Sequence, residues 1–282
     1  MGEPTRVAVE GHDVELVPER LYRLGGLISL RGTISWVPKA AVGHLPVNCY
    51  LLRENASWLL VDTGVPAHAA QIGEQLHRLV PSEEELQLYV TRIEPDVVSN
   101  LRMLTNHFGV EKVYGGGVMN PFDYFDDLSA EAHIQADSGL RLIRMSPDSS
   151  VELAATRPLK LVPTALRLLY TFWAYDSETK TMFTSDSFGH AYLNDPSEQP
   201  VVTSANDTST LDQVRAHLLT KFDWLQGADT DVIHDDVARI FETYDVEIIA
   251  PSSGMVLQGK DVVDRHVGMV KQVLLDLYDD QT

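Results

Sequence analysis

The order of strand and helix patterns along the 282 residues constrains the fold of this chain more than any other feature. Strand-like apolar runs fill the first sixty residues, and a helical pattern follows with apolar residues at Ala69, Ile72, Leu76 and Leu79. A second series of strand-like runs begins near Leu140 and gives way to helical patterns. Two β-rich halves that each end in helices predict an α/β fold in which two mixed β-sheets are flanked by helices, an αββα sandwich.

The individual elements follow from apolar periodicity and from the turns between them. Helices are predicted over 95–107, where Pro95 suits a first helical turn, and over about 210–224, 229–244 and 262–277. The Gly-rich and acidic segment 115–138 is predicted to be a loop with some helix, suited to a lid or a partner surface. The predicted strands are 14–17, 27–36, 47–52, 58–62, 86–91, 112–114, 140–145, 151–154, 159–162, 166–175, 181–184 and 246–250.

Composition excludes several classes of function. The net charge of -19 opposes binding to nucleic acid or to an anionic membrane surface, because both partners are themselves negative. Cys49 is the single cysteine and lies in an apolar run, which excludes a disulfide framework and a cysteine zinc motif. No apolar run reaches the length of a membrane span or a signal peptide, so we expect a cytoplasmic protein.

A charged segment, Thr91–Val97, lies at the junction between the strand predicted over 86–91 and the helix that begins at Pro95. It brings Arg92, Glu94 and Asp96 into one tight turn. Carboxylates that converge in this way repel one another unless a cation lies between them. The segment therefore marks the candidate functional site of the chain.

Five segments together carry a resemblance to a known fold family. They occur in the order found in metallo-β-lactamase-fold proteins, and the chain most resembles the lactamase-like domain of flavodiiron and oxygen-binding di-iron proteins over roughly residues 14–275. The resemblance implies one such domain over residues 1–282, with no flavodoxin-like domain and no bound flavin. The segments are Asn48–Leu52, Trp58–Gly64, Thr91–Val97, Phe183–Gly189 and Ile249–Gly254.

In that family the first metal-binding cluster reads H-x-E-x-D-H, and no histidine occupies the matching frame here. Three of the seven matching positions keep an oxygen ligand, namely Glu94, Asp96 and Asp186, whereas Asp62 matches a buried support residue. The four imidazole positions hold two guanidinium groups, one isopropyl group and one hydroxyl group. The seven positions are Arg92, Glu94, Asp96, Val97, Arg167, Asp186 and Ser253.

These substitutions argue against a site for two metals. A guanidinium group stays protonated, cannot act as a metal ligand and repels a divalent cation. The same group can pair with the carboxylates in place of the metals. We expect a salt-bridged cluster of Arg92, Arg167, Glu94, Asp96 and Asp186. Two alternatives are an inert remnant that only fixes the loops and a single hard divalent cation held by Glu94, Asp96 and Asp186.

Two classes of function fit this cluster. In the first, a metal-free site binds a small anionic ligand or a partner in the former active-site cleft, where Arg92 and Arg167 clamp the anion. Further ligand-binding candidates are Asp186, Ser253, Tyr124, His44 and His190.

The alternative is an enzyme with hydrolase or lyase chemistry, in which Glu94 or Asp96 is the general base and Arg92 or Arg167 stabilises negative charge. A hydrolase with one metal held only by carboxylates is a variant of it. Di-iron reduction of oxygen or nitric oxide fits this site less well, because redox iron needs imidazole ligands. The resemblance also implies a homodimer.

Overall fold

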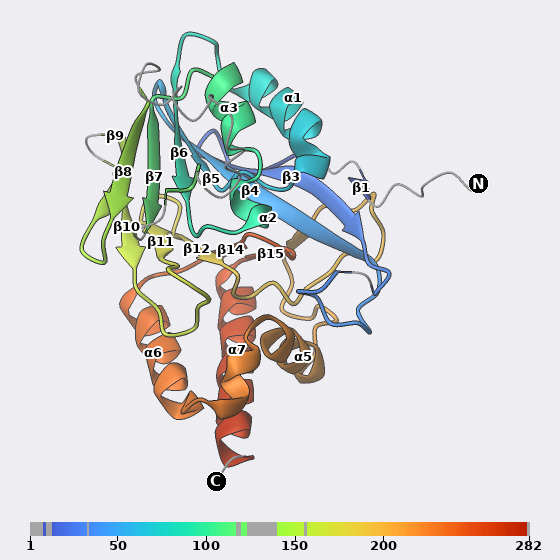
Figure 1. Cartoon of the computed structure of the whole chain (residues 1–282). Coiled ribbons are helices and arrows are strands. Elements are labelled where there is room, and N and C mark those ends of the chain that lie inside the picture. The colour runs from blue at the N-terminus through green and yellow to red at the C-terminus, as the bar shows by residue number, and fades with distance from the viewer. Residues whose placement is uncertain are drawn as a thin grey trace.

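The computed structural model describes residues 8–9, 13–32, 34–116, 120–122, 140–154 and 157–280. Two β-sheets pack face to face in this part of the chain, and helices cover their outer faces (Figure 1). The predicted αββα sandwich is confirmed. Tyr124, one of the predicted ligand-binding residues, lies outside the described residues. No helix among the described residues is both long and apolar enough to cross a membrane.

The first sheet has eight strands in the order β1-β3-β4-β5-β6-β7-β8, with β2 paired to β3. Its strands are antiparallel as far as β5 and parallel from β5 to β8. The strands are β1 (Ala8–Val9), β2 (Val14–Val17), β3 (Leu21–Ser29), β4 (His44–Glu54), β5 (Ser57–Val61), β6 (Glu85–Val90), β7 (Lys112–Gly116) and β8 (Arg141–Met145). The parallel crossovers contain η1 (Pro66–His68), α1 (Ala69–Leu79), α2 (Pro95–Val98) and α3 (Leu101–His107).

The second sheet has seven strands in the order β13-β15-β14-β12-β11-β10-β9. It is also mixed, because β12 runs parallel to β14 while β11 and β12 are antiparallel. The strands are β9 (Ser150–Ala154), β10 (Arg157–Val162), β11 (Trp173–Asp176), β12 (Thr181–Ser185), β13 (Val201–Val202), β14 (Ile248–Pro251) and β15 (Val256–Gln258). The helices of this half are α5 (Leu211–Lys221), η4 (Asp223–Gly227), α6 (Thr230–Thr243) and α7 (Lys260–Asp279).

Three apolar layers hold the sandwich together. Side chains such as Tyr50, Tyr89 and Phe183 fill the space between the two sheets. Ile72 and Leu76 of α1 pack on the outer face of the first sheet, and residues of α5, α6 and α7 pack on the outer face of the second. Because both faces of each sheet are covered, the central strands are apolar almost throughout, as in β4 and β12.

Three predicted elements differ from the structure. The strand predicted over 27–36 ends at Ser29, and Gly32 in the following turns has a left-handed φ of 71°. The strand predicted over 166–175 is reduced to β11, since Leu169 is exposed with a φ of 49°. The helix predicted over 95–107 is divided between α2 and α3, and the Asn100 side chain donates to the carbonyls of Thr63 and Val65 at the break.

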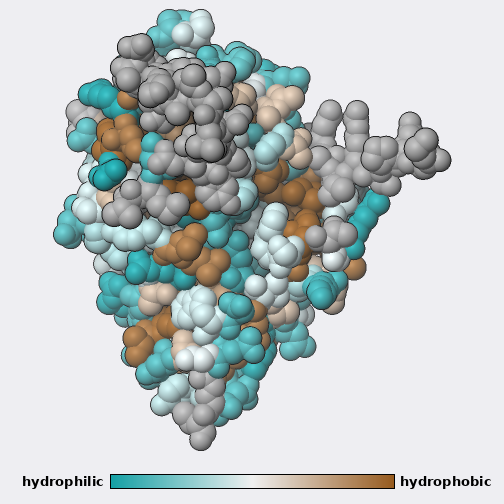
Figure 2. All heavy atoms as spheres, viewed as in Figure 1, coloured by the Kyte–Doolittle hydropathy of each residue, from teal (hydrophilic) through white to brown (hydrophobic). Residues whose placement is uncertain are grey.

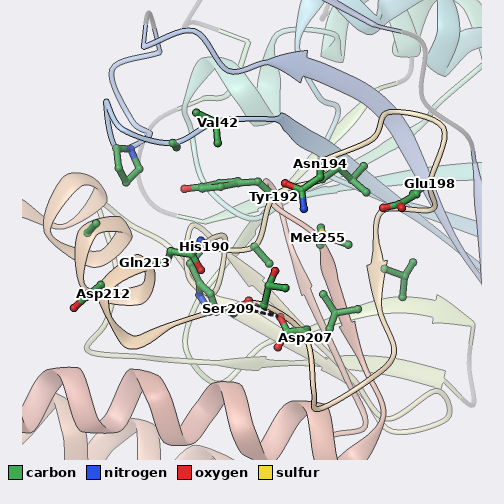
Figure 3. A pocket seen from close by; sticks show the side chains of 18 of the residues that line it. Val42, His190, Tyr192, Asn194, Glu198, Asp207, Ser209, Asp212, Gln213 and Met255 are labelled. Atoms are coloured by element: carbon green, nitrogen blue, oxygen red, sulfur yellow. Dashed lines mark hydrogen bonds between the residues drawn. The ribbon is translucent and has the colours of Figure 1, made fainter.

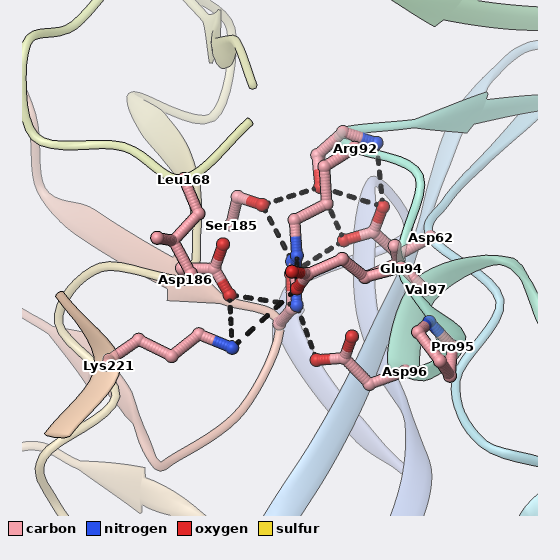
Figure 4. Close-up of polar contacts among 12 residues, drawn as sticks. Asp62, Arg92, Glu94, Pro95, Asp96, Val97, Leu168, Ser185, Asp186 and Lys221 are labelled. Atoms are coloured by element: carbon pink, nitrogen blue, oxygen red, sulfur yellow. Dashed lines mark hydrogen bonds and ion pairs between the residues drawn. The ribbon is translucent and has the colours of Figure 1, made fainter. Parts of the chain in front are cut away.

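The strand ends β5, β6, β12 and β14 meet where the two sheets face each other (Figures 1 and 4). Asn48 fixes one side of this meeting point, because its side-chain amide donates to the carbonyls of Pro251 and Gly254, each at 2.8 Å. Arg23 Nε in turn donates to the side-chain oxygen Oδ1 of Asn48 at 2.8 Å. Each hydrogen-bonding group of the buried Asn48 side chain therefore has a partner. Asn48 links the two halves of the sandwich and holds their loops in register.

Candidate functional site

A cluster of buried ionic side chains occupies the place where the strand ends meet (Figure 4). Both sheets and one helix contribute to it. Asp62 follows β5, the turn from Arg92 to Asp96 joins β6 to α2, and Ser185 and Asp186 end β12. Ser252 follows β14, and Lys221 is the last residue of α5. We refer to Asp62, Arg92, Glu94, Asp96, Asp186 and Lys221 as the ion cluster.

Arg92 lies at the centre of the ion cluster, and its side chain is fully buried. Its Nε donates to Glu94 Oε2 at 2.7 Å, and its Nη2 pairs with Asp96 and, at 2.8 Å, with Asp186 Oδ1. Its Nη1 donates to the hydroxyl groups of Ser185 and Ser252 at 2.8 and 3.3 Å. Burial alone would lower the pKa of Arg92, but the carboxylates around it outweigh burial and hold that pKa above its usual value.

Lys221 supplies the second cation of the cluster, and sequence analysis did not identify it. Its Nζ lies 2.7 Å from Asp186 Oδ1 and 3.8 Å from Glu94 Oε2, and the residue is 9% exposed. A lysine in the last turn of an amphipathic helix usually interacts with the helix C-terminus and solvent. No sequence motif around Lys221 predicts that its side chain reaches Asp186, which lies 35 residues earlier in the chain.

Asp62 supports the cluster from the first sheet. Its carboxylate accepts hydrogen bonds from the Thr91 main-chain amide at 2.8 Å and from the Ser252 hydroxyl at 2.7 Å. Burial raises the pKa of Asp62 to about 6, although Arg92 and these hydrogen bonds oppose the rise. Asp62 also has a left-handed φ of 62°, a backbone conformation that aspartate tolerates better than most residues.

Negative charge exceeds positive charge in the cluster. Four carboxyl groups (Asp62, Glu94, Asp96 and Asp186) face two basic side chains, Arg92 and Lys221, which leaves a formal charge of -2 if every group is ionised. Burial raises the pKa of Asp186, and Arg92 and Lys221 only partly offset this effect. Asp62 and Asp186 therefore take up protons more readily than aspartate does in water.

The four residues Arg92, Glu94, Asp96 and Asp186 come together as predicted, but Arg167 does not join them. Arg167 is exposed on the loop between β10 and β11, and no ion pair reaches it within the part of the chain that the structure describes. The expectation of a paired Arg167 was wrong because this loop replaces the strand predicted over 166–175. Lys221 pairs with Asp186 instead.

The other predicted residues lie around the cluster rather than in it. Ser253 is buried and its main chain pairs with Val47, while its neighbour Ser252 makes the side-chain contacts. Val97 packs with Val90 and Val98. His44 begins β4, where its main chain pairs with Leu193, and His190 lies in the wall of a separate cavity.

Solvent reaches the cluster mainly at Glu94. The Glu94 side chain is 23% exposed, whereas those of Asp96 and Asp186 are 7% and 2% exposed. All three nitrogens of the Arg92 guanidinium group already have partners. Glu94 is thus the member of the cluster that an incoming molecule would meet first.

Replacement of Arg92 by methionine should destabilise the protein by about 3–5 kcal/mol at pH 7.5, because it leaves three carboxylates, two of them buried, without their shared cation. Chemical denaturation measures the change in the free energy of unfolding. Arg92→Lys keeps the charge but loses the fork of donors, and it should fall between wild type and Arg92→Met.

Arg78→Met is the matched control for this change, since Arg78 forms an ion pair with Asp13 on the surface. Its cost should be at most about 1 kcal/mol, as is usual for an exposed pair. Equal costs for Arg92→Met and Arg78→Met would contradict a structural role of the Arg92 network.

The raised pKa of Asp62 predicts a pH dependence of stability. A group whose pKa is higher in the folded than in the unfolded state stabilises the fold fully below its unfolded pKa, and this contribution is lost as pH rises through the folded value. For Asp62 the loss falls between about pH 4 and 7. Asp62→Asn removes the titration and keeps a residue that adopts a left-handed backbone.

The free energy of unfolding of wild type relative to Asp62→Asn should therefore decrease by about 2 kcal/mol from pH 4.5 to 7.5. Urea denaturation of both proteins across this range measures the difference. A difference that is constant with pH, or that increases, would show that Asp62 does not titrate in this window.

Comparisons with known proteins agree with this architecture. Solved structures with the same fold include a putative diflavin flavoprotein fragment from Nostoc sp. PCC 7120, with a TM-score of 0.68 and 15% identity over 96% of both chains. Rubredoxin oxygen:oxidoreductase from Desulfovibrio gigas has a TM-score of 0.65 at 15% identity over 94% of this chain, which spans 62% of that protein. The chemotaxis sensor ODP, solved as a peroxy di-iron species, has a TM-score of 0.57 at 15% identity over 92% of this chain and 94% of its own.

These identities show a common fold and carry no residue roles by themselves. No curated protein sequence matches the chain. A family model does match, over residues 45–254, and this stretch includes every residue of the ion cluster. The chain belongs to the ODP family of beta-lactamase-like proteins.

Proposed function

We propose that this protein is a metal-free member of its family, in which the ion cluster takes the place of a di-iron centre and the site binds a small anionic ligand or a partner. The observation that carries the proposal is the position of the Arg92 guanidinium group, which is in contact with Glu94, Asp96 and Asp186 at once. A metal held by these three carboxylates would have to occupy the same space.

The donor set also does not fit a di-iron centre. No imidazole contacts the three carboxylates within the described residues, and the guanidinium group of Arg92 carries a fixed positive charge that repels metal ions, with Lys221 as a second basic group beside Asp186. In the described part of the chain, the histidine and carboxylate side chains that converge closely enough for a metal are Asp231, His234 and Asp235, which lie near the start of α6 and away from this site. The same argument disfavours a single hard cation on Glu94, Asp96 and Asp186.

An anionic ligand would meet Arg167 rather than Arg92. Arg92 has no nitrogen left to bind a ligand, because each of its nitrogens already contacts a carboxylate or a hydroxyl group. Arg167 is exposed on a loop that contacts the turn of Asp186, because the Ser187 hydroxyl donates to the Leu166 carbonyl at 3.3 Å. An exposed guanidinium group keeps its fork of donors for a carboxylate or phosphate group. The ligand would therefore bind at the mouth of the former cleft.

An enzyme is the second candidate, and the exposure of Glu94 is the observation that favours it. Glu94 alone among the three carboxylates paired with Arg92 is accessible enough to take a proton from a bound molecule. Arg92 and Lys221 both lie within 4 Å of its Oε2, so a bound molecule would compete with these two ion pairs for the carboxylate. Binding without turnover requires fewer assumptions about the site, and we therefore place it first.

Metal analysis tests the proposal directly. Protein produced in medium with iron, zinc and manganese should contain less than about 0.2 metal ions per chain, because the carboxylates are already paired with Arg92 and Lys221. Added Fe²⁺, Zn²⁺ or Mn²⁺ should leave the thermal midpoint unchanged, since only a ligand that binds the folded state raises it. Two ions per chain, or a clear rise in the midpoint with one of them, would refute a metal-free site.

Anion binding is tested with succinate and inorganic phosphate as probes, titrated into the protein and followed by calorimetry. At least one should bind, and Arg167→Gln should weaken that binding by roughly tenfold because it removes the charge-assisted pair. Arg31→Gln, at another exposed arginine, should leave the affinity unchanged. Equal weakening by both variants would indicate general attraction of anions, and no binding of either probe would contradict an anion site.

A further inference from the structure

Three histidines are buried together where α5 and α7 meet the turn that follows β12. His190, His217 and His266 are 1%, 3% and 0% exposed. His190 Nε2 and His266 Nδ1 form a hydrogen bond of 2.8 Å, and these two rings stack with centroids 5.1 Å apart. The ring of His217 also packs against His190, with centroids 6.1 Å apart. We refer to His190 and His266 as the histidine pair.

The geometry of the histidine pair leaves no place for added protons. A neutral imidazole has one N–H group and a charged imidazole has two. Only one hydrogen atom fits between the two facing nitrogens at 2.8 Å, so both rings cannot be charged while they stay in contact. A charged His190 would also carry a buried Nδ1–H group that has no acceptor among the described residues. A charged His266 would turn its Nε2–H group toward the guanidinium group of Arg265, which is 3.4 Å away.

The charged groups around the histidine pair mostly oppose a further positive charge. Arg265 of α7 contacts the pair, and on α5 His217 is followed one helical turn later by Lys221. The carboxylate that approaches the pair from the segment before α5 is Asp207, whose Oδ1 lies 3.6 Å from Nε2 of His266. Because Arg265 already forms an ion pair with Asp207, this carboxylate is not free to balance a charged imidazole.

Both rings of the pair are therefore neutral in the folded structure at pH 7. Burial lowers the pKa of His190 well below its usual value of 6.5, and the basic groups around it add to this effect. Burial also lowers the pKa of His266 to about 4, with Asp207 opposing the change. Since each pKa is lower in the folded state than in water, the buried contact is most stable above about pH 6.5 and loses stability as the pH falls below that value.

One continuous segment, residues 207–221, covers the histidine pair. It begins at Asp207, which lies with His190 in the wall of a separate cavity (Figure 3). The helix α5 follows, packs His217 against the pair and ends with Lys221 in the ion cluster. A displacement of this segment would thus expose the pair to solvent and withdraw Lys221 from the ion cluster at the same time.

The helix α5 is held by fewer apolar side chains than α7. The apolar residues that α5 buries are Val214 and Leu218, whereas α7 buries apolar side chains along its length, from Val262 to Leu277. Figure 2 shows small, separate hydrophobic areas on the visible face of this half, so the closed position of α5 keeps its apolar residues from solvent. Displacement of α5 carries the cost of exposing them, and proton binding can offset that cost.

We propose that the histidine pair makes the docking of α5 sensitive to acid. Below about pH 6, protons that bind the exposed rings of His190 and His266 favour a state in which residues 207–221 have moved away from α7 and Lys221 has left the ion cluster. Acid thereby opens the ion cluster and removes one of its two basic side chains. The opening depends on the histidine pair alone, whereas its effect on ligand binding rests on the proposed function of the ion cluster.

Hydrogen exchange of the full chain from pH 7.5 to 5.0, corrected for the intrinsic exchange rates and followed by mass spectrometry, measures the opening of α5. Each ring that is neutral when closed and free when open should increase the opening constant about thirtyfold over this range, and the pair roughly 1,000-fold. At pH 5.0 the amides of α5 should open far more readily than those of β4, because the displacement is local.

Two substitutions assign the effect to the pair. His190→Gln keeps a polar group near the position of Nε2, and His266→Asn keeps one near the position of Nδ1, but each removes a titrating ring. Each should reduce the acid-driven increase in α5 opening about thirtyfold. His107→Gln is the matched control, since it removes an exposed histidine of α3 and should leave the increase unchanged. The comparison with wild type cancels the carboxyl groups, which titrate in all of these proteins.

Three results would overturn the proposal. They are an α5 opening constant that changes less than about tenfold between pH 7.5 and 5.0, equal opening constants for α5 and β4 at pH 5.0, and a wild-type pH dependence in both histidine variants. The first two are measured on the wild-type protein and do not depend on the folding of a variant. Metal content and anion binding at the ion cluster are separate measurements, so their failure would leave the acid-driven opening in place.

Discussion

The contact of one guanidinium group with three carboxylates determines how the rest of this structure is arranged. Arg92 pairs with Glu94 and Asp96 of its own turn and with Asp186 at the end of β12, and so it joins the first sheet to the second at their open ends. Its remaining donors reach Ser185 and Ser252. Loops from three strand ends thus depend on a single side chain that is fully buried.

This contact matters for stability because its loss would leave buried carboxylates without a paired cation. A buried ion pair adds little net stability compared with an apolar pair of the same shape, because both charges lose their hydration. The removal of one partner is costly, since the others stay buried without compensation. In this site the carboxylates outnumber the cations, and the raised pKa values of Asp62 and Asp186 show that Arg92 and Lys221 do not fully balance them. The cluster keeps the loops in place because separating its side chains would leave buried charges unpaired.

Sequence analysis could predict the parts of the fold and site that local patterns determine. Apolar periodicity located most strands and the helices of the second half, and the turn 91–97 identified Arg92, Glu94 and Asp96 as neighbours. It could not predict Lys221 in place of Arg167, because that choice depends on how α5 and the loop before β11 pack against β12. The apolar run 166–175 favours a strand, but Leu169 adopts a left-handed backbone and the chain turns away. Long-range packing, which overrides local preference, accounts for both errors.

A cavity lined in part by His190, Tyr192 and the first turns of α5 lies near the ion cluster and is built on two of the same segments. The turn after β12 carries Asp186 at one end and His190 at the other, and α5 carries Gln213 and Ala216 in the cavity wall and Lys221 in the cluster. His217, one helical turn before Lys221, fills the space between them, with its ring centroid 6.1 Å from that of His190. Burial, reinforced by Lys221, lowers the pKa of His217 to about 4.

A neutral imidazole at this position separates the charge of Lys221 from the apolar cavity. A cation there would lie close to Lys221 and would weaken its pair with Asp186. The spacing of His217 and Lys221 on one face of α5 therefore satisfies two requirements at once, since it places positive charge in the cluster and excludes it from the cavity. The helix α5 thus presents an ionic side chain to the cluster and a neutral imidazole toward the adjacent cavity.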